Sequence, residues 1–164
     1  MSKRFQGLGV ALITPFTPEG NIDFPGLERM VHHVSTSKAH FLVALGSTGE
    51  AQLMSEEEQR RVLDFIVEVN AGRLPVVAGF SAAGGTRAAV DRIKALDVEG
   101  LAGLLISPPA YVKPGQAGMV AISRLWPGLP HCRSSCTMSR PGQVWTWRPQ
   151  RSSNWPMPVP TWSD

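Results

Sequence analysis

The stretch FLVALGSTGE, at residues 41–50, decides the fold. Its first half is a short apolar run, which predicts a buried strand. Its second half, residues 46–50, combines two glycines with two hydroxyl side chains and predicts a tight turn whose backbone can approach a ligand. In parallel α/β folds, ligands bind where strands end in such turns. The stretch therefore predicts a parallel sheet with a binding site at its carboxyl edge.

Strand-like and helix-like segments alternate on both sides of this stretch. The strand segments are apolar throughout rather than alternating, which is typical of a parallel sheet covered by helices. Periodicity alone fits an open doubly wound sheet or half of a (β/α)8 barrel equally well. We expect strands at residues 9–16, 41–45, 75–80 and 101–106, and helices at residues 24–37, 55–72 and 86–96.

The composition changes abruptly near residue 122. Residues 1–122 carry 11 Lys and Arg against 12 Asp and Glu, a net charge of −1, whereas residues 123–164 carry 5 Arg and one Asp, a net charge of +4. All 5 tryptophans lie in the second part, which has no sustained hydrophobic period. We expect one folded domain at residues 1–121 and an irregular, disordered tail at residues 122–164. An aromatic, basic tail could also stack on single-stranded nucleic acid. We favour the interpretation that this tail is sequence that does not fold, and we expect no nucleic-acid partner.

The turn after the second strand is the strongest candidate site. The hydroxyls of Ser47 and Thr48, with backbone N–H groups between Gly46 and Gly49, suit a carboxylate. A Gly-Ser-Thr-Gly sequence also occurs in plain turns, so this motif alone leaves both interpretations open.

Tyr111 follows the fourth predicted strand and could relay protons, or could equally pack over the proline-rich loop around it. Lys113 lies between valine and proline in that loop, where a solvated lysine is the simpler interpretation. His32 and His33 are adjacent on a helix and cannot face one metal together. We therefore expect no metal and no cofactor.

No run of about 18 or more apolar residues predicts a membrane span, and the first residues lack the apolar core of a secretory signal. We expect a cytoplasmic protein without a membrane partner.

Four segments together resemble one family, the dihydrodipicolinate synthase / N-acetylneuraminate lyase family. They are residues 9–16 (GVALITPF), 46–50 (GSTGE), 66–73 (IVEVNAGR) and 111–114 (YVKP), in the family's order and spacing. The resemblance covers about residues 5–121. It implies the N-terminal half of a (β/α)8 TIM barrel, with about four βα units, from a usually homotetrameric enzyme.

The resemblance also implies an activity. Members are class I pyruvate-dependent lyases that hold pyruvate as a lysine Schiff base, and in lysine biosynthesis condense it with aspartate-semialdehyde. Thr48, with Gly46 and Gly49, would bind the pyruvate carboxylate, and Ser47 and Tyr111 would relay protons. Alternatives are an N-acetylneuraminate or 2-keto-3-deoxygluconate lyase, or a non-catalytic fragment.

The family's later Tyr-Asn-Val-Pro-x-Arg-Thr-Gly motif and its lysine do not appear in this sequence. The codons for residues 136–144, read in a frame shifted by one base, can encode that motif. For example, methionine has a single codon, ATG. Where the next serine codon begins with TC, the shifted frame at Met138 reads GTC, which encodes valine. We therefore hypothesise a frame break after about residue 121. It would leave the chain without its Schiff-base lysine, so we expect the chain to be inactive. We also expect the fourth strand to have an unpaired edge.

Sequencing the DNA across the codons for Ala121 and Ile122 tests this hypothesis. One additional base should restore the motif followed by a lysine. A genomic sequence in which no alternative frame encodes the motif would contradict it.

Overall fold

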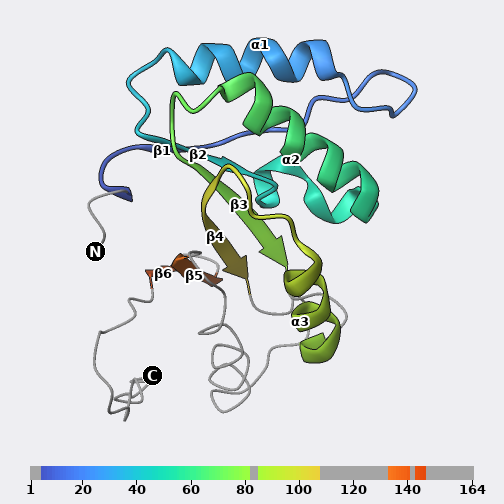
Figure 1. Cartoon of the computed structure of the whole chain (residues 1–164), viewed down its shortest axis with the longest axis vertical. Coiled ribbons are helices and arrows are strands. Elements are labelled where there is room, and N and C mark those ends of the chain that lie inside the picture. Colours follow the sequence, from blue (N-terminus) through green and yellow to red (C-terminus); the bar gives the residue numbers. More distant parts are fainter. Residues whose placement is uncertain (1–4, 82–84, 108–132, 141–142, 147–164) are drawn as a thin grey trace.

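The computed structural model describes residues 5–81, 85–107, 133–140 and 143–146 (Figure 1). Its centre is a six-stranded sheet in the order β1-β2-β3-β4-β5-β6. The strands are β1 Gly9–Ala11, β2 Phe41–Ala44, β3 Val76–Ser81, β4 Leu101–Ser107, β5 Arg133–Arg140 and β6 Gln143–Thr146. The helices are α1 Phe24–Ser35, α2 Glu56–Asn70 and α3 Gly85–Ala95, and two 3-10 turns, η2 Ser47–Gly49 and η3 Ala51–Leu53, follow β2.

The first four strands pair parallel to one another in chain order. A helix returns the chain between each pair, because parallel neighbours need a crossover connection. All four carboxyl ends consequently lie at one edge of the sheet. This confirms the parallel α/β fold expected from the apolar strands and places the residues that follow β2 at that edge.

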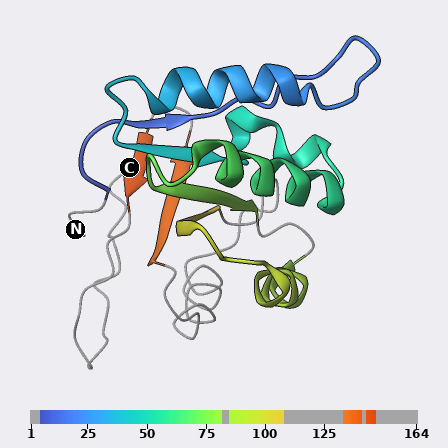
Figure 2. The same ribbon diagram turned by 45° about the horizontal axis from the view of Figure 1, so that its top comes forward.

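The core lies between the sheet and the two helices α1 and α2, which lie side by side (Figures 1 and 2). Phe24 of α1 and Phe65 of α2 meet edge to face with ring centroids 5.0 Å apart, a preferred geometry for aromatic pairs. The largest fully buried apolar side chains come from the sheet, from both helices and from the segment after β1: Leu12, Leu27, Val31, Leu42, Val62, Ile66, Val76, Leu104 and Ile106. Helical spacing of the apolar residues in α1 and α2 produces this shared face.

Helix α2 begins as its sequence predicts. The Ser55 hydroxyl accepts a hydrogen bond from the Glu58 N–H at 3.2 Å, and the Glu58 carboxylate accepts one from the Ser55 N–H at 2.8 Å, which completes a capping box. These hydrogen bonds from Ser55 lower the pKa of Glu58 below its ordinary value. At the other end, the left-handed conformation begins at Ala71 (φ 48°), one residue before the expected Gly72 (φ 72°).

The first strand is shorter than predicted. Only Gly9–Ala11 of residues 9–16 is strand, and exposure alternates beyond it, with Leu12 2% and Ile13 51% exposed. The expectation of a continuously buried strand is wrong at Ala11 and Ile13, because Leu12 belongs to the core cluster and the two exposed residues alternate with it.

Part of the expected irregular tail is also regular. β5 pairs parallel to β4 over Gly103–Ile106, and β6 returns antiparallel to β5. The edge of β4 is therefore paired, contrary to the expectation of an open edge, since a strand edge offers backbone hydrogen bonds to any extended segment. The other residues of the tail lie outside the described ranges, and the division at residue 121 stays a prediction.

Candidate functional site

The candidate site is the turn at residues 45–50, where the chain leaves β2 at the carboxyl edge of the parallel strands. Ser47 and Thr48 are exposed there, whereas Gly49 is buried. The carboxyl edge is the face on which parallel α/β proteins place their binding loops. The turn thus lies at the carboxyl edge, as its sequence predicts, and its role as a ligand site stays a prediction.

The backbone of this turn is closed by two hydrogen bonds. The Gly49 N–H donates to the Gly46 carbonyl at 3.0 Å, and the Glu50 N–H donates to the Ser47 carbonyl at 3.2 Å. No acceptor among the described residues receives the N–H of Ser47 or Thr48, as expected for the first donors of a 3-10 turn. With respect to the described part of the chain, these two backbone donors and the hydroxyls of Ser47 and Thr48 could therefore bind an anionic ligand.

The turn crosses the neighbouring strand at Gly79 of β3. Leu45 adopts φ 54°, a left-handed conformation that is uncommon for a residue with a side chain. A Cβ at position 79 would lie 2.2 Å from the Leu45 carbonyl oxygen and 2.7 Å from the Gly46 nitrogen. Gly79 is therefore required because the backbone of residues 45–46 occupies the space where its side chain would be.

Behind the turn, the segment that follows β1 holds Gly49. The Thr14 hydroxyl, buried with its residue 4% exposed, donates to the Gly49 carbonyl at 2.7 Å. A Cβ on Gly49 would lie 3.1 Å from the Leu12 carbonyl oxygen, so this glycine is closely packed. The turn is thus fixed between the segment after β1 on one side and β3 on the other.

Gly46 has a different role from the one its motif suggests. It is extended (φ −73°, ψ −176°), and a Cβ there would meet only Val43 at 3.9 Å. Neither conformation nor space requires a glycine at this position. The tight approach predicted from the pair of glycines is real at Gly49 but not at Gly46.

Sequence reasoning missed three residues that hold the site: Thr14, Leu45 and Gly79. Two of them carry a detectable signal. Gly79 is a glycine inside a strand, which marks a close backbone approach, and Thr14 is a hydroxyl residue in an otherwise apolar run. Leu45 resembles any other apolar residue of a strand. Tyr111 and Lys113, the other candidates for chemistry, lie outside the described residues.

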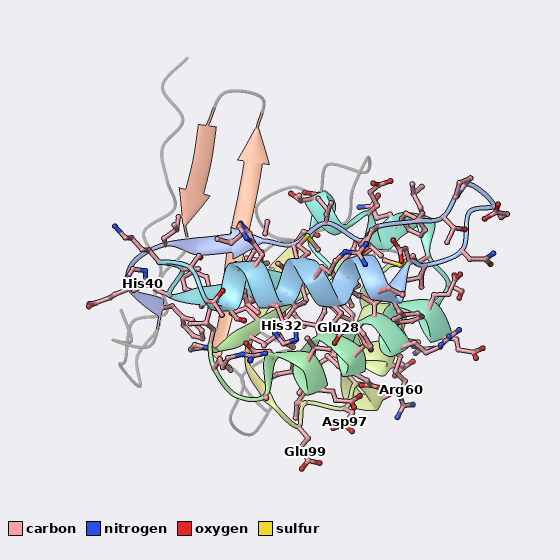
Figure 3. The ribbon with its side chains drawn as sticks, turned by 90° about the horizontal axis from the view of Figure 1, so that it is seen from above. Glu28, His32, His40, Arg60, Asp97 and Glu99 are labelled. Atoms are coloured by element: carbon pink, nitrogen blue, oxygen red, sulfur yellow. The ribbon has the colours of Figure 1, made fainter. Side chains whose placement is uncertain are left out.

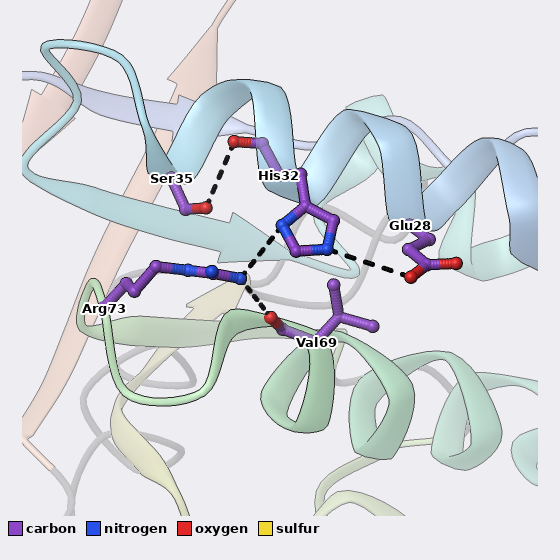
Figure 4. Close-up of polar contacts among 5 residues, drawn as sticks. All are labelled: Glu28, His32, Ser35, Val69 and Arg73. Carbon is purple, nitrogen blue, oxygen red and sulfur yellow. Dashed lines mark hydrogen bonds and ion pairs between the residues drawn. The ribbon is translucent and has the colours of Figure 1, made fainter.

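Two of the described histidines, His32 and His40, make structural contacts. His32 pairs with Glu28 at 3.8 Å and with the Arg73 guanidinium at 3.1 Å, which links α1 to the end of α2 (Figure 4). His40 lies at the opposite end of β1 and β2, where its ring accepts a hydrogen bond from the Leu8 N–H (Figure 3). Within the described ranges, no three His, Cys, Asp or Glu side chains come together as metal ligands.

A hollow lies away from the carboxyl edge of the sheet, between α2 and the turn that precedes β4. Its floor is apolar and its rim is acidic: Leu63, Val67, Leu101, Asp64, Glu68, Asp97 and Glu99 line it. Asp97 and Glu99 point outward at one side of the molecule (Figure 3). Exposed carboxylates of this kind are an ordinary solvated surface. Over the part of the chain that the structure covers, no helix is long and apolar enough to cross a membrane.

We expect Gly79→Ala to disturb the site and Gly46→Ala to be tolerated. The added methyl at position 79 overlaps the Leu45 carbonyl, so the free energy of unfolding should fall by about 1–3 kcal/mol. At position 46 the same methyl meets open space, and stability should change by less than about 1 kcal/mol. Urea unfolding of both variants measures the difference, and equal stability of the two would contradict this account.

Comparison with known proteins identifies relatives for most of the chain. Residues 4–123 match the Dihydrodipicolinate synthetase family. The 4-hydroxy-tetrahydrodipicolinate synthase of Phocaeicola vulgatus is 37% identical over 116 residues, which are 71% of this chain and 39% of the relative. That of Methylococcus capsulatus is 42% identical over 114 residues, 70% of this chain and 39% of the relative.

Solved structures agree with these sequences. The 4-hydroxy-tetrahydrodipicolinate synthase of Methylacidiphilum fumariolicum SolV superposes with a TM-score of 0.67 at 30% identity, over 73% of this chain and 39% of that one. A structure described as the first monomeric dihydrodipicolinate synthase variant gives a TM-score of 0.68 at 30% identity, over 74% and 40%. The four parallel strands match the N-terminal part of these TIM barrels, and the chain spans about 39% of the length of the curated relatives it matches.

Proposed function

The chain belongs to the dihydrodipicolinate synthetase family, and on this basis we propose that residues 46–50 bind the carboxylate of pyruvate. The family expected from the sequence motifs is confirmed. The parent activity we propose is that of 4-hydroxy-tetrahydrodipicolinate synthase, because three of the relatives named above carry that name. The fourth is described as a dihydrodipicolinate synthase variant. That activity belongs to proteins of which this chain spans about 39%, so it extends to this chain only as a proposal.

The geometry of the turn carries the proposal. The N–H groups of Ser47 and Thr48, which no described residue accepts, and the exposed hydroxyls of the same two residues lie at the carboxyl edge of the sheet. A carboxylate accepts several hydrogen bonds, and bonds to a charged acceptor are the stronger kind. Thr48 would hold the carboxylate, with Gly46 and Gly49 shaping the backbone around it.

Ser47 would relay protons in the parent reaction, together with Tyr111. A hydroxyl can accept and donate a proton in the same site, which is what a relay needs. The assignment of Tyr111 as the partner of Ser47 rests on the family resemblance, because Tyr111 lies outside the described residues. The second substrate would be aspartate-semialdehyde.

We propose that this chain does not form the pyruvate imine. Of its four lysines, Lys38 precedes β2 and Lys94 lies near the end of α3, so both stand at the amino end of the sheet and both are exposed. Neither is beside the turn. Lys3 and Lys113 lie outside the described ranges. Covalent catalysis needs an amine next to the bound carbonyl carbon, and neither of the two described lysines supplies one. The missing Schiff-base lysine motif of the family, noted in the sequence, is the second ground for the proposal that the chain binds pyruvate without catalysing.

The remaining expectations follow the family. A homotetramer is proposed for full-length members, and one solved relative is described as a monomeric variant, so assembly differs among them. A cytoplasmic location is likewise proposed for this chain. The family match ends at residue 123, close to the predicted change at residue 121, which supports the proposed frame break.

Pyruvate titration of the full chain, followed by amide NMR, tests the binding. The amide signals of Ser47 and Thr48 should shift, while those of Lys38 and Lys94 should not. Thr48→Val should weaken binding by about ten- to a hundredfold, because it removes one hydrogen bond to a charged group, worth about 1.5–3 kcal/mol. Thr36→Val, the same substitution at the exposed end of α1, serves as a control that leaves residues 45–50 intact.

Borohydride reduction in the presence of pyruvate then tests the absence of imine chemistry. The mass of the chain should stay unchanged. An adduct of one reduced pyruvate would contradict the non-catalytic proposal and would identify the reacting lysine by peptide mapping. An absence of any pyruvate-induced shift would contradict the carboxylate site itself.

A further inference from the structure

We propose that Thr14 is a positioning residue for the bound carboxylate, acting through a chain of hydrogen bonds that ends at the Thr48 N–H. The inference rests on the proposed pyruvate site and adds a residue from a different strand to it. Thr14 follows β1, 35 residues from Gly49 along the sequence. Its side chain would not touch the ligand.

Burial makes the Thr14 hydrogen bond significant. Thr14 and Asn70 are the buried polar side chains of the described core. The side-chain amide of Asn70 donates to the Leu74 carbonyl through its NH2 group and accepts from the Leu74 N–H through its oxygen. It thereby holds the local turn after α2. Thr14 instead donates to a carbonyl of the candidate site, at 2.7 Å. A buried hydrogen bond is stronger electrostatically than one in water, and the loss of the donor leaves the carbonyl unsatisfied.

The hydrogen bonds continue from Gly49 to the ligand side of the turn. The Gly49 carbonyl shares its peptide group with the Glu50 N–H, which donates to the Ser47 carbonyl at 3.2 Å. The Ser47 carbonyl in turn shares its peptide group with the Thr48 N–H. Because linked hydrogen bonds polarise one another, the Thr14 hydroxyl strengthens Thr48 as a donor and also fixes the direction of its N–H.

The Ser47 N–H provides an internal comparison. It shares a peptide group with the Gly46 carbonyl, which accepts from the Gly49 N–H at 3.0 Å. That second chain of hydrogen bonds does not include the Gly49 carbonyl, so it does not reach Thr14. A change at Thr14 that acts through the proposed chain should therefore affect the two neighbouring amides differently.

Packing alone would not produce this difference. Valine has nearly the shape of threonine and would fill the same space without donating. Serine keeps the donor and loses the methyl. Thr14→Val and Thr14→Ser thus separate the hydroxyl from the volume of the side chain.

The experiment compares the two variants with the wild-type full chain by amide NMR, first alone and then with pyruvate. Thr14→Val should move the Thr48 and Glu50 amide protons upfield and leave that of Ser47 nearly unchanged, while Thr14→Ser keeps all three. Thr14→Val should weaken pyruvate binding by about tenfold and Thr14→Ser by less than about twofold. If Thr14→Val does not fold, Thr14→Cys, whose thiol is a weak donor, should give intermediate shifts.

Unchanged Thr48 shifts in Thr14→Val, or equal shifts at Ser47 and Thr48, would overturn the inference. So would wild-type affinity for pyruvate in Thr14→Val, which assigns Thr14 to stability alone. A wild-type chain that does not bind pyruvate would instead remove the proposed function and the ligand role of Thr14 with it. The two failures are distinguishable, because only the second is seen without any variant.

Discussion

The parallel pairing of β2 with β3 is the constraint on which the site depends. Its register sets Ala44 opposite Ala78, so the next residues along β2 pass over Gly79. A side chain at position 79 would collide with that backbone, and Leu45 must accept a left-handed conformation to make the crossing. The turn that follows is therefore directed by the sheet. The pairing of β2 with β3 therefore fixes where the exposed hydroxyls of Ser47 and Thr48 lie.

The alternation of strands and helices was predictable because each segment buries an apolar face, and the periodicity of that face is visible in the sequence. The capping box at Ser55 was predictable for the same local reason. The supports of the site were not, since Thr14 and Gly49, or Leu45 and Gly79, meet across more than 30 residues. The length of β1 depends on which of its faces other elements cover. The β5–β6 hairpin depends on backbone pairing with the edge of β4, and backbone groups leave no pattern in the sequence.

Relatives of the chain close these strands into complete barrels, whereas the described sheet here continues differently. β5 extends the parallel order beside β4, but β6 turns back antiparallel. A barrel of the family's kind needs every strand parallel. The described fold therefore retains the edge that carries the candidate turn and differs from such a barrel beyond the fourth strand.

Backbone amide hydrogen exchange of the full chain tests most directly whether these strands and the turn form one stable unit. The amides of β2, β3 and β4 and those of α2 should exchange slowest and with one common free energy of opening, as members of one cooperative core. The Gly49 amide should be protected with them, since its N–H is bonded to the Gly46 carbonyl and its residue is buried. Rapid exchange of Gly49 alone would show a turn that the strands do not hold. Rapid exchange throughout β2–β4 would contradict the account altogether.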